Sequence, residues 1–286
     1  MKLEGKKILV TGGSGSLGVH LIGELLRRRA GKVVSLSRDE GLVRRAEQEI
    51  NSSAVELLVG DITDPKAVKR AIDGVQIVYH TAAMKHVSIA EKNPREVLRI
   101  NVLGILNVLD HANHVERFVN VSSDKVIGVM NCYGSSKLLA EYLVQETNNI
   151  LPGIFLNVRC PNFLGSRGSV IDNWMTSIKR RNMIQVTDPD MTRYFIALPD
   201  AAKFIVDTSL RDDLSPSTYY YPSTDVHKFR LGDLSEAFVK TYGDDGTEIQ
   251  VIGRQPGEKL HENYMEEVGL ADIRALERML RETLVL

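Results

Sequence analysis

The sequence predicts an α/β fold in which a doubly wound parallel sheet is followed by a smaller C-terminal region. Short apolar runs alternate with amphipathic stretches through the first half of the chain, and the glycine-rich segment TGGSGSLG follows the first apolar run at residues 11–18. A repeated order of strand, helix and strand indicates a parallel sheet covered by helices on both faces. Ligands of such a sheet bind beyond the carboxyl ends of its strands.

Six strands and five helices are expected before about residue 160. The expected strands are the short apolar runs Lys7–Thr11, Val33–Ser37, Val55–Val59, Ile77–His80, Phe118–Ser122 and Ile154–Val158. The expected helices carry apolar residues at helical spacing, at Leu17–Arg29, Leu42–Ile50, Ala67–Ile72, Pro94–Asn113 and Ser135–Asn148. Each helix lies between two strands, as a connection between parallel strands requires.

Beyond about residue 160 the regular alternation ends. The irregular segments SRGSVID, VTDPDMTRYF and YYYPSTDVHKF separate isolated helical patterns at Leu198–Leu210, Leu231–Tyr242 and Ile273–Thr283. We therefore expect two units, residues 1–160 and residues 161–286, interleaved with one another. The second unit is expected to lie over the ligand-binding edge of the sheet.

Composition and charge exclude several classes of partner. The 36 basic and 37 acidic residues give a formal net charge of −1, so no nucleic acid and no membrane surface is expected as a partner. The two cysteines, Cys132 and Cys160, fit neither a metal site nor a disulfide framework. The segment MKLEGKK lacks the features of a signal peptide, and no apolar run approaches the roughly 18 residues of a membrane span. A cytoplasmic protein without a metal is expected.

The glycine-rich segment predicts a dinucleotide site. Gly12, Gly15 and Gly18 recur at three-residue spacing between the first expected strand and the first expected helix. Without a Cβ atom, such a turn lets backbone N–H groups and the helix N-terminus approach a pyrophosphate. The spacing alone is a weak signal, but its position between strand and helix is specific. Ser16 and Leu17 belong to the same expected site.

The ends of the next two strands bear on the choice of cofactor. Ser37 and Arg38 suit the 2′-phosphate of NADP, whereas the neighbouring Asp39 keeps NAD possible. Asp61 and Ile62, after the third strand, are expected to contact the adenine, although an aspartate here is also typical of an ordinary turn. NADP is therefore the predicted cofactor.

A tyrosine and a lysine predict a catalytic pair. Tyr133 and Lys137 stand four residues apart, so they are neighbours on one helical face. A nearby ammonium favours the phenolate and lowers its pKa, which makes the tyrosine a usable base. The YxxxK spacing alone is common, but here the serine-rich strand end at Ser122 and Ser123 lies ten residues upstream.

With these motifs the chain resembles the extended short-chain dehydrogenase/reductases, which have a Rossmann sheet. The resemblance narrows to the inverting UDP-N-acetylglucosamine 4,6-dehydratases of bacterial polysaccharide and flagellin-sugar biosynthesis. Its motifs are HTAAMKHV at residues 80–87, AEKNP at 90–94, NVLG at 101–104, SDK at 123–125, LGSRGSV at 164–170, TDPDMTR at 187–193 and PGEKL at 256–260. They extend over nearly the whole chain, and SDK and TDPDMTR are the most discriminating.

The resemblance implies a tightly held NADP that is reduced and reoxidised within one turnover. Tyr133 takes the proton of the sugar 4-hydroxyl, and water then leaves across C5 and C6. Elimination of water requires an acid and a base, which Asp124 and Lys125 offer if the first is protonated and the second neutral. Ser123 is expected to bond the 4-oxygen, and Lys85 to assist proton return to C5.

Further contacts are implied by the same resemblance. The cofactor contacts are expected to include Ala82, Ala83 and Asn101, with Tyr133 and Lys137. An arginine suits a diphosphate because it binds in bidentate fashion. Contacts with a UDP-sugar substrate are expected from Lys85, Asn162, Ser169, Val170, Thr187, Arg193, Arg254 and Glu258.

Alternatives remain open at this point. A 4-epimerase or 4-keto reductase for a nucleotide sugar needs Tyr133 and Lys137 but not the pair of Asp124 and Lys125. A regulatory protein that binds NADP without turnover has no need of an elimination acid. The chain also departs from the family pattern at Ser123, where threonine is usual, and at Cys160-Pro161, where tyrosine and glycine are usual. A homo-oligomer is expected.

Overall fold

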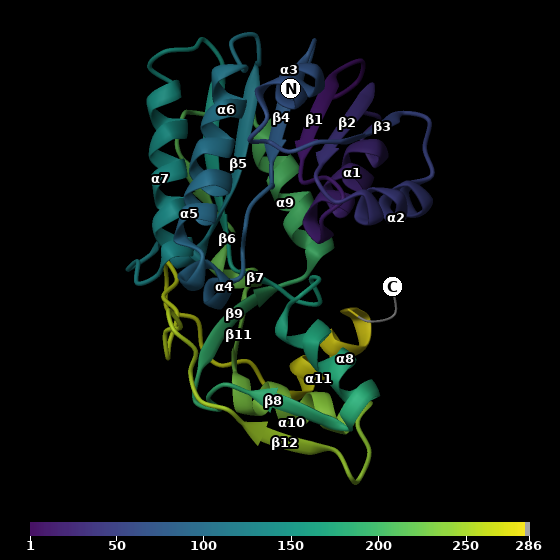
Figure 1. The fold of residues 1–286 in the computed structure, drawn as a ribbon, viewed down its shortest axis with the longest axis vertical. Helices are drawn as coiled ribbons and strands as arrows, with labels where there is room; N and C mark the ends of the chain where they lie inside the picture. Colours follow the sequence, from purple (N-terminus) through teal and green to yellow (C-terminus); the bar gives the residue numbers. More distant parts are fainter. Residues whose placement is uncertain (284–286) are drawn as a thin grey trace.

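A seven-stranded parallel sheet forms the upper body of the protein in the computed structural model, which describes residues 1–283 (Figure 1). Residues 284–286 of the expected second unit lie outside the described residues. The strand order is β10-β6-β5-β4-β1-β2-β3. The strands are β1 (Lys7–Thr11), β2 (Lys32–Ser37), β3 (Val55–Val59), β4 (Ile77–His80), β5 (Arg117–Ser123), β6 (Ile154–Cys160) and β10 (Thr218–Tyr220). The predicted doubly wound α/β fold is confirmed.

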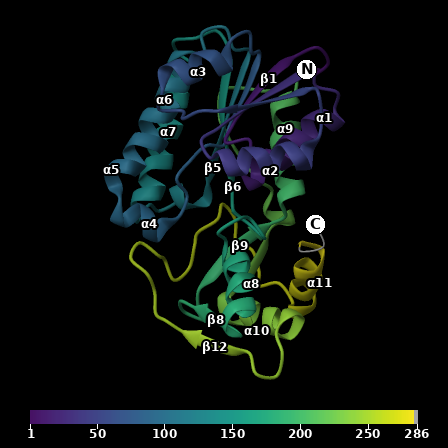
Figure 2. The same ribbon diagram turned by 45° about the vertical axis from the view of Figure 1, so that its right-hand side comes forward.

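Helices cover both faces of this sheet, and the side chains of β1 show how. Ile8 and Val10 are fully buried in one core with residues of α1 (Ser16–Arg27) and α9 (Leu198–Leu210). Leu9, between them, points the other way into a core with α3 (Pro65–Ile72), α6 (Gly104–Asp110) and α7 (Cys132–Thr147). Figure 2 shows these two helical layers on opposite sides of the sheet. Burial on both faces explains the continuous apolar runs of the strands.

The stretch expected as one helix, Pro94–Asn113, has three parts. It begins as α5 (Pro94–Val97), continues as a π-helix, η1 (Leu98–Leu103), and ends as α6. The other helices of this body are α2 (Glu40–Ile50) and α4 (Val87–Lys92). Asn101, within η1, bonds the backbone of Met84 and the hydroxyl of Ser136, so the widened turn ties the loop after β4 to α7.

A smaller body lies below the carboxyl ends of the strands (Figure 1). Its strands are β7 (Asn162–Phe163), β8 (Met183–Val186), β9 (Thr192–Ile196), β11 (His227–Arg230) and β12 (Glu248–Val251). Its helices are α8 (Val170–Arg181), α10 (Leu231–Tyr242) and α11 (Ile273–Thr283). Trp174, Phe238 and Leu280 are members of its separate apolar core.

Three segments expected to be irregular contain regular structure. SRGSVID leads into α8, VTDPDMTRYF contains most of β9, and YYYPSTDVHKF contains the end of β10 and most of β11. Polar or charged residues interrupt the apolar ones in these strands, as Arg193 does in β9 and Lys228 in β11, so the sequence shows no apolar run like those of β1 and β4. The two bodies interleave, because α9 packs on α1 and β10 pairs with β6 although both follow residue 160.

None of the helices within residues 1–283 is long and apolar enough to cross a membrane.

Candidate active site

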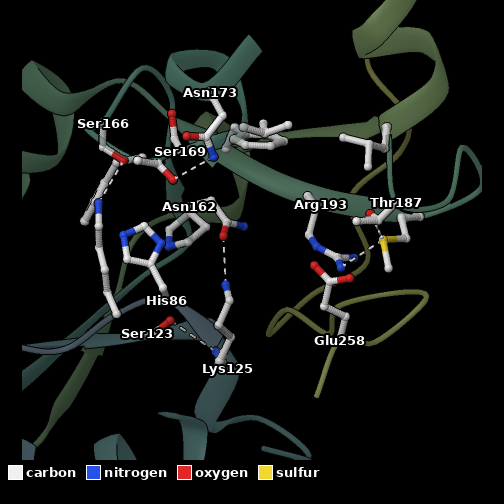
Figure 3. A pocket seen from close by; sticks show the side chains of 18 of the residues that line it. His86, Ser123, Lys125, Asn162, Ser166, Ser169, Asn173, Thr187, Arg193 and Glu258 are labelled. Atoms are coloured by element: carbon white, nitrogen blue, oxygen red, sulfur yellow. Dashed lines mark hydrogen bonds between the residues drawn. The ribbon is translucent and has the colours of Figure 1, made fainter. Parts of the chain in front are cut away.

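A cavity of about 550 Å³ opens where the carboxyl ends of β5 and β6 meet the smaller body. Figure 3 shows side chains that line it, with Ser123 and Lys125 on one wall and Asn162 and Arg193 on another. Expected site residues that line it are Lys85, Ser123, Lys125, Tyr133, Asn162, Ser169, Val170, Thr187, Arg193 and Glu258. The fold therefore brings together residues from six separate sequence motifs.

The end of β5 places three reactive side chains side by side. Asp124 and Lys125 begin a short 3-10 helix, η2 (Asp124–Val126), directly after Ser123. The Ser123 hydroxyl donates to Asp124 Oδ1 over 2.9 Å, and Lys125 Nζ lies 3.1 Å from the same oxygen. Lys125 Nζ also donates to Asn162 Oδ1 over 2.8 Å. The Asp124 side chain is fully buried behind this wall.

The protonation states of the pair differ in part from expectation. Burial raises the pKa of Asp124 to about 7, and the charge of Glu262 adds to that effect although Lys125 opposes it. A protonated Asp124 is therefore available near neutral pH. For Lys125 burial acts to lower the pKa, but Asp124 and Glu262 outweigh it and the pKa is raised. The structure favours a charged Lys125 over the expected neutral one, because the Glu262 carboxylate holds its proton even when Asp124 is protonated.

Tyr133 lies at the first turn of α7 and faces the cavity. Burial raises its pKa, while the charge of Lys125 and a hydrogen bond with Ser123 lower it in part. Lys137 is buried, and its Nζ donates to the Val121 carbonyl oxygen over 2.7 Å. Burial lowers the pKa of Lys137 to about 8. Lys125 is therefore a cation that favours the Tyr133 phenolate, and the expected effect of Lys137 on Tyr133 stays a prediction.

Lys85 reaches the cavity from the loop after β4. Its Nζ donates to the Arg167 carbonyl oxygen over 2.7 Å and lies 3.5 Å from the Ser166 hydroxyl. Desolvation by the cavity walls and the charge of Arg167 lower its pKa, although Asp172 opposes them. Of the two lysines assigned to the sugar, Lys85 is the one whose pKa is lowered, whereas that of Lys125 is raised.

The two arginines expected to bind the diphosphate lie in different surroundings. Arg193 lines the cavity, and its guanidinium donates to the carbonyl oxygens of Thr192, Lys259 and Leu260. Arg254 is not among the residues that line this cavity; its side chain is more than half exposed and lies 3.6 Å from Asp188. Of the two arginines, the structure therefore places only Arg193 in the cavity wall.

The remaining expected substrate contacts carry structural bonds as well. Asn162 Nδ2 donates to the Tyr194 carbonyl oxygen over 2.8 Å. Ser169 caps α8 directly before Val170, and the Thr187 hydroxyl donates to the Met191 sulfur. Glu258 accepts a hydrogen bond from the Gln255 backbone. All of them keep a position in the cavity wall.

The glycine turn has the shape of a pyrophosphate cradle. Gly12 has φ +71°, and a Cβ atom there would lie 2.9 Å from the backbone of Ala82. A Cβ atom on Gly18 would lie 2.4 Å from the Gly12 carbonyl oxygen. Helix α1 begins after Gly15 and has neither a side-chain cap nor an acidic residue in its first turn. Its N-terminal N–H groups are therefore open to an anion, so the residues fit a dinucleotide.

Residues expected near the adenine end divide into two groups. Arg38 is mostly exposed and lies 3.8 Å from Asp61, so both remain at the surface of the turn. Ser37 is buried and accepts a hydrogen bond from the Ser14 backbone, which places it beneath the glycine turn. Ile62 is a core residue, and Asn101 is bound to Met84 and Ser136, so their side chains serve packing and loop geometry instead.

Three residues of the site were not predicted. Ser122 lines the cavity, and its buried hydroxyl has no hydrogen-bond partner within the described part of the chain. The Arg167 guanidinium donates to the Ser14 carbonyl oxygen, and its backbone N–H donates to the Ser16 hydroxyl over 3.0 Å. Glu262 lies 3.1 Å from Lys125. Ser122 had a signal in the serine-rich strand end and Arg167 in the LGSRGSV motif, whereas Glu262 depends on contacts between distant segments.

The parallel sheet, its glycine turn and the tyrosine and lysine of α7 define an extended short-chain dehydrogenase/reductase. The chain belongs to the polysaccharide biosynthesis protein family, whose model matches residues 8–283. The predicted family is therefore confirmed.

Relatives and a solved structure agree with this assignment. The inverting UDP-N-acetylglucosamine 4,6-dehydratase of Campylobacter jejuni is 33% identical over 90% of this chain and 77% of its own length. "Uncharacterized membrane protein MJ1061" of Methanocaldococcus jannaschii is 34% identical over 96% of this chain and 84% of its own length. A UDP-glucose 4-epimerase of Rickettsia conorii is 30% identical over 93% of this chain and 80% of its own length. The dTDP-glucose 4,6-dehydratase DesIV of Streptomyces venezuelae, solved with NAD and TYD bound, shares the fold at a TM-score of 0.85, 19% identity and 96% coverage of each chain.

Gly12→Ala should impair both stability and dinucleotide binding. The new Cβ atom meets the Ala82 backbone in a left-handed conformation, which costs about 1–3 kcal/mol. Gly23→Ala is the matched control, because Gly23 lies within α1 with open space around it and should gain about 0.5–1 kcal/mol. Urea unfolding and fluorescence titration with NADPH measure the two effects. Equal behaviour of the two variants would contradict the role of the turn.

Proposed function

We propose that the protein is a UDP-N-acetylglucosamine 4,6-dehydratase that inverts C5. The observation that carries the proposal is the buried Asp124, whose raised pKa supplies an acid beside Tyr133 and the cavity. Oxidation and reduction at C4 alone need a base such as Tyr133 but no acid for a leaving hydroxyl. The activity named for the Campylobacter jejuni relative supports the same assignment.

The chemistry divides among named side chains. Tyr133 accepts the proton of the sugar 4-hydroxyl, and Ser123 bonds the 4-oxygen. Asp124 then gives its proton to the departing 6-hydroxyl, which leaves as water, while neutral Lys85 accepts the proton of C5. The Lys125 ammonium stabilises the negative charge that develops on the 4-oxygen as that proton leaves. Bound NADP would supply the hydride acceptor for C4 and the hydride donor for C6. The enolate left by hydride addition then takes a solvent-derived proton at C5, on the face opposite Lys85, so C5 is inverted and no net oxidation results.

The substrate is proposed to lie between the sheet and the smaller body. Asn162 and Arg193 lie in the wall beside Lys125, where they suit the phosphates, and Thr187 and Glu258 suit the nucleoside. Ser169 and Val170 bring the start of α8 to the same cavity. Arg254 lies outside the cavity wall, so its proposed contact with UDP requires the substrate to extend toward the segment after β12.

A 4-epimerase is the second candidate, and the Rickettsia conorii relative favours it. Such an enzyme uses Tyr133 and Ser123 but leaves Asp124 without a chemical role. A protein that only binds NADP would leave the whole cavity wall unused. The product of the reaction therefore distinguishes the three functions.

Purified protein should convert UDP-N-acetylglucosamine, with no added NADPH, into a product lighter by one water. Mass spectrometry measures the loss, and the same reaction in deuterated water should place deuterium at C5 in the proton NMR spectrum. A product of unchanged mass would establish the epimerase instead. No conversion of any UDP-hexose would support the binding function.

NADP is proposed as the cofactor, with NAD as the alternative, because Arg38 is mostly exposed and its distance of 3.8 Å from Asp61 is long for an ion pair, so its guanidinium can pair with a 2′-phosphate. Arg38→Ala should weaken NADP binding by about 10–100-fold, the usual effect of losing a charge-assisted hydrogen bond. The affinity of the same variant for NAD should stay within about threefold of the wild-type value, because NAD lacks that phosphate. Arg180→Ala, an exposed change in the smaller body, is the control. Equal losses for both cofactors in calorimetric titration would refute the assignment.

A homo-oligomer is proposed from the surface of the helical layer that contains α5, η1, α6 and α7. Large apolar side chains are about half exposed there, at Ile89, Leu98, Leu103, Leu139 and Tyr142.

A cytoplasmic location is also proposed, with the free Cys132 and Cys160 in support.

Leu103→Glu should convert the oligomer into monomers by placing a charge in the apolar surface. Ile150→Glu is the control, because Ile150 is exposed beyond the end of α7. Light scattering after gel filtration measures the mass of each variant. A monomeric wild-type protein would reject the proposal.

A further inference from the structure

Glu262 is a buried carboxylate at the centre of the site that the proposed chemistry leaves without a role. Its side chain is 7% exposed and comes from the segment after β12. Oε1 lies 3.1 Å from Lys125 Nζ and 3.3 Å from Arg193 Nε, and Oε2 accepts from Asn162 Nδ2 over 3.0 Å. Three donors from three separate elements therefore converge on one carboxylate.

These donors determine the charge of Glu262. Burial acts to raise its pKa, but the charges of Lys125 and Arg193 outweigh burial and lower it to about 2. Glu262 is thus ionised at every pH at which the protein would work. It is also a wall residue of a smaller cavity that adjoins Lys125 and Asn162.

Lys125 lies between two carboxyl groups. Its Nζ is 3.1 Å from Asp124 Oδ1 and 3.1 Å from Glu262 Oε1. On its own the Lys125 charge would favour ionised Asp124, whereas Glu262 favours the protonated form. Asp124 Oδ2 is buried and receives no hydrogen bond within residues 1–283, and a hydrogen bond between the side chains of Asp124 and Glu262, which needs a proton on one of the two carboxyl groups, also raises the pKa of Asp124.

The groups that face Asp124 come from every element packed around it. Ser123 and Lys125 adjoin it in the chain, Tyr133 comes from α7, and Cys160 comes from β6. Glu262 and Tyr264 come from the segment after β12, and Arg193 of β9 acts on Glu262. The ionised groups among them are Lys125, Glu262 and Arg193.

We propose that Glu262 is a positioning residue that neutralises the effect of Lys125 on Asp124, so that Asp124 keeps the proton which the leaving hydroxyl requires. The use of this proton by the leaving hydroxyl rests on the proposed dehydration, whereas the effect of Glu262 on the protonation of Asp124 does not. Glu262 touches no reacting atom; it acts through Lys125 and Asp124. The smaller body thereby sets the protonation state of an acid in the sheet.

Glu262→Gln tests the proposal because it removes the charge and keeps the size of the side chain. Infrared spectroscopy follows the protonated carboxyl of Asp124 across pH, with Asp124→Asn as the reference that identifies the band. The wild-type band should titrate with a midpoint of about 7. In Glu262→Gln the midpoint should fall by about one pH unit or more, which lowers the protonated fraction at neutral pH from about a half to about a tenth.

Two further variants separate charge from structure. Glu262→Asp keeps the carboxylate and should restore the midpoint toward the wild-type value. Glu267→Gln, an exposed change five residues on, should leave it unaltered. In turnover, Glu262→Gln should lower kcat about fivefold at neutral pH and shift the pH profile of kcat to lower pH, as expected for loss of the protonated acid.

An unaltered Asp124 midpoint in folded Glu262→Gln would overturn the proposal. If that variant does not fold, the titration of the wild-type protein tests the proposal. A wild-type Asp124 midpoint below about 5, near the ordinary carboxyl value, would also overturn the proposal. The mass of the wild-type product tests dehydration separately. Failure of the proposed function and failure of the Glu262 proposal are therefore distinguishable.

Discussion

The site depends on one buried carboxyl group, Asp124, and on the charges that meet around it. Burial of a carboxyl group favours its neutral form, while a neighbouring ammonium favours the ionised form. In this protein Lys125 is shared between Asp124 and Glu262, so its charge is divided and the pKa of Asp124 stays near neutrality. An acid that is half protonated near pH 7 is suited to proton transfer in both directions.

This balance explains why the smaller body is part of the chemistry as well as of substrate binding. Its β9 supplies Arg193, the start of β7 supplies Asn162, and the segment after β12 supplies Glu262. The loop after β7 also reaches the glycine turn, where Arg167 contacts Ser14 and Ser16. Movement of the smaller body would therefore alter both the expected cofactor cradle and the charge around Asp124.

Local motifs could be found in the sequence because their physical meaning lies within a few residues. The glycine turn and the Tyr133 to Lys137 spacing each belong to one strand-to-helix junction or one helical turn, and the apolar runs each belong to one buried strand. The strands β9, β10 and β11 were not predicted because polar or charged residues interrupt their apolar ones, so no continuous apolar run marks them. Glu262 escaped because its position in the sequence carries no sign of Lys125, 137 residues earlier.

The sequence by itself determined the class of fold and the family, since these follow from patterns that each segment carries alone, and through the family resemblance it gave ten of the residues that line the cavity. Only the tertiary structure decided which groups are charged. Lys125 keeps its proton, the pKa of Lys85 is lowered, and Lys137 donates to the Val121 carbonyl oxygen. The reason is physical: a pKa depends on burial and on the charges within a few ångströms, and those neighbours come from segments that only folding brings together.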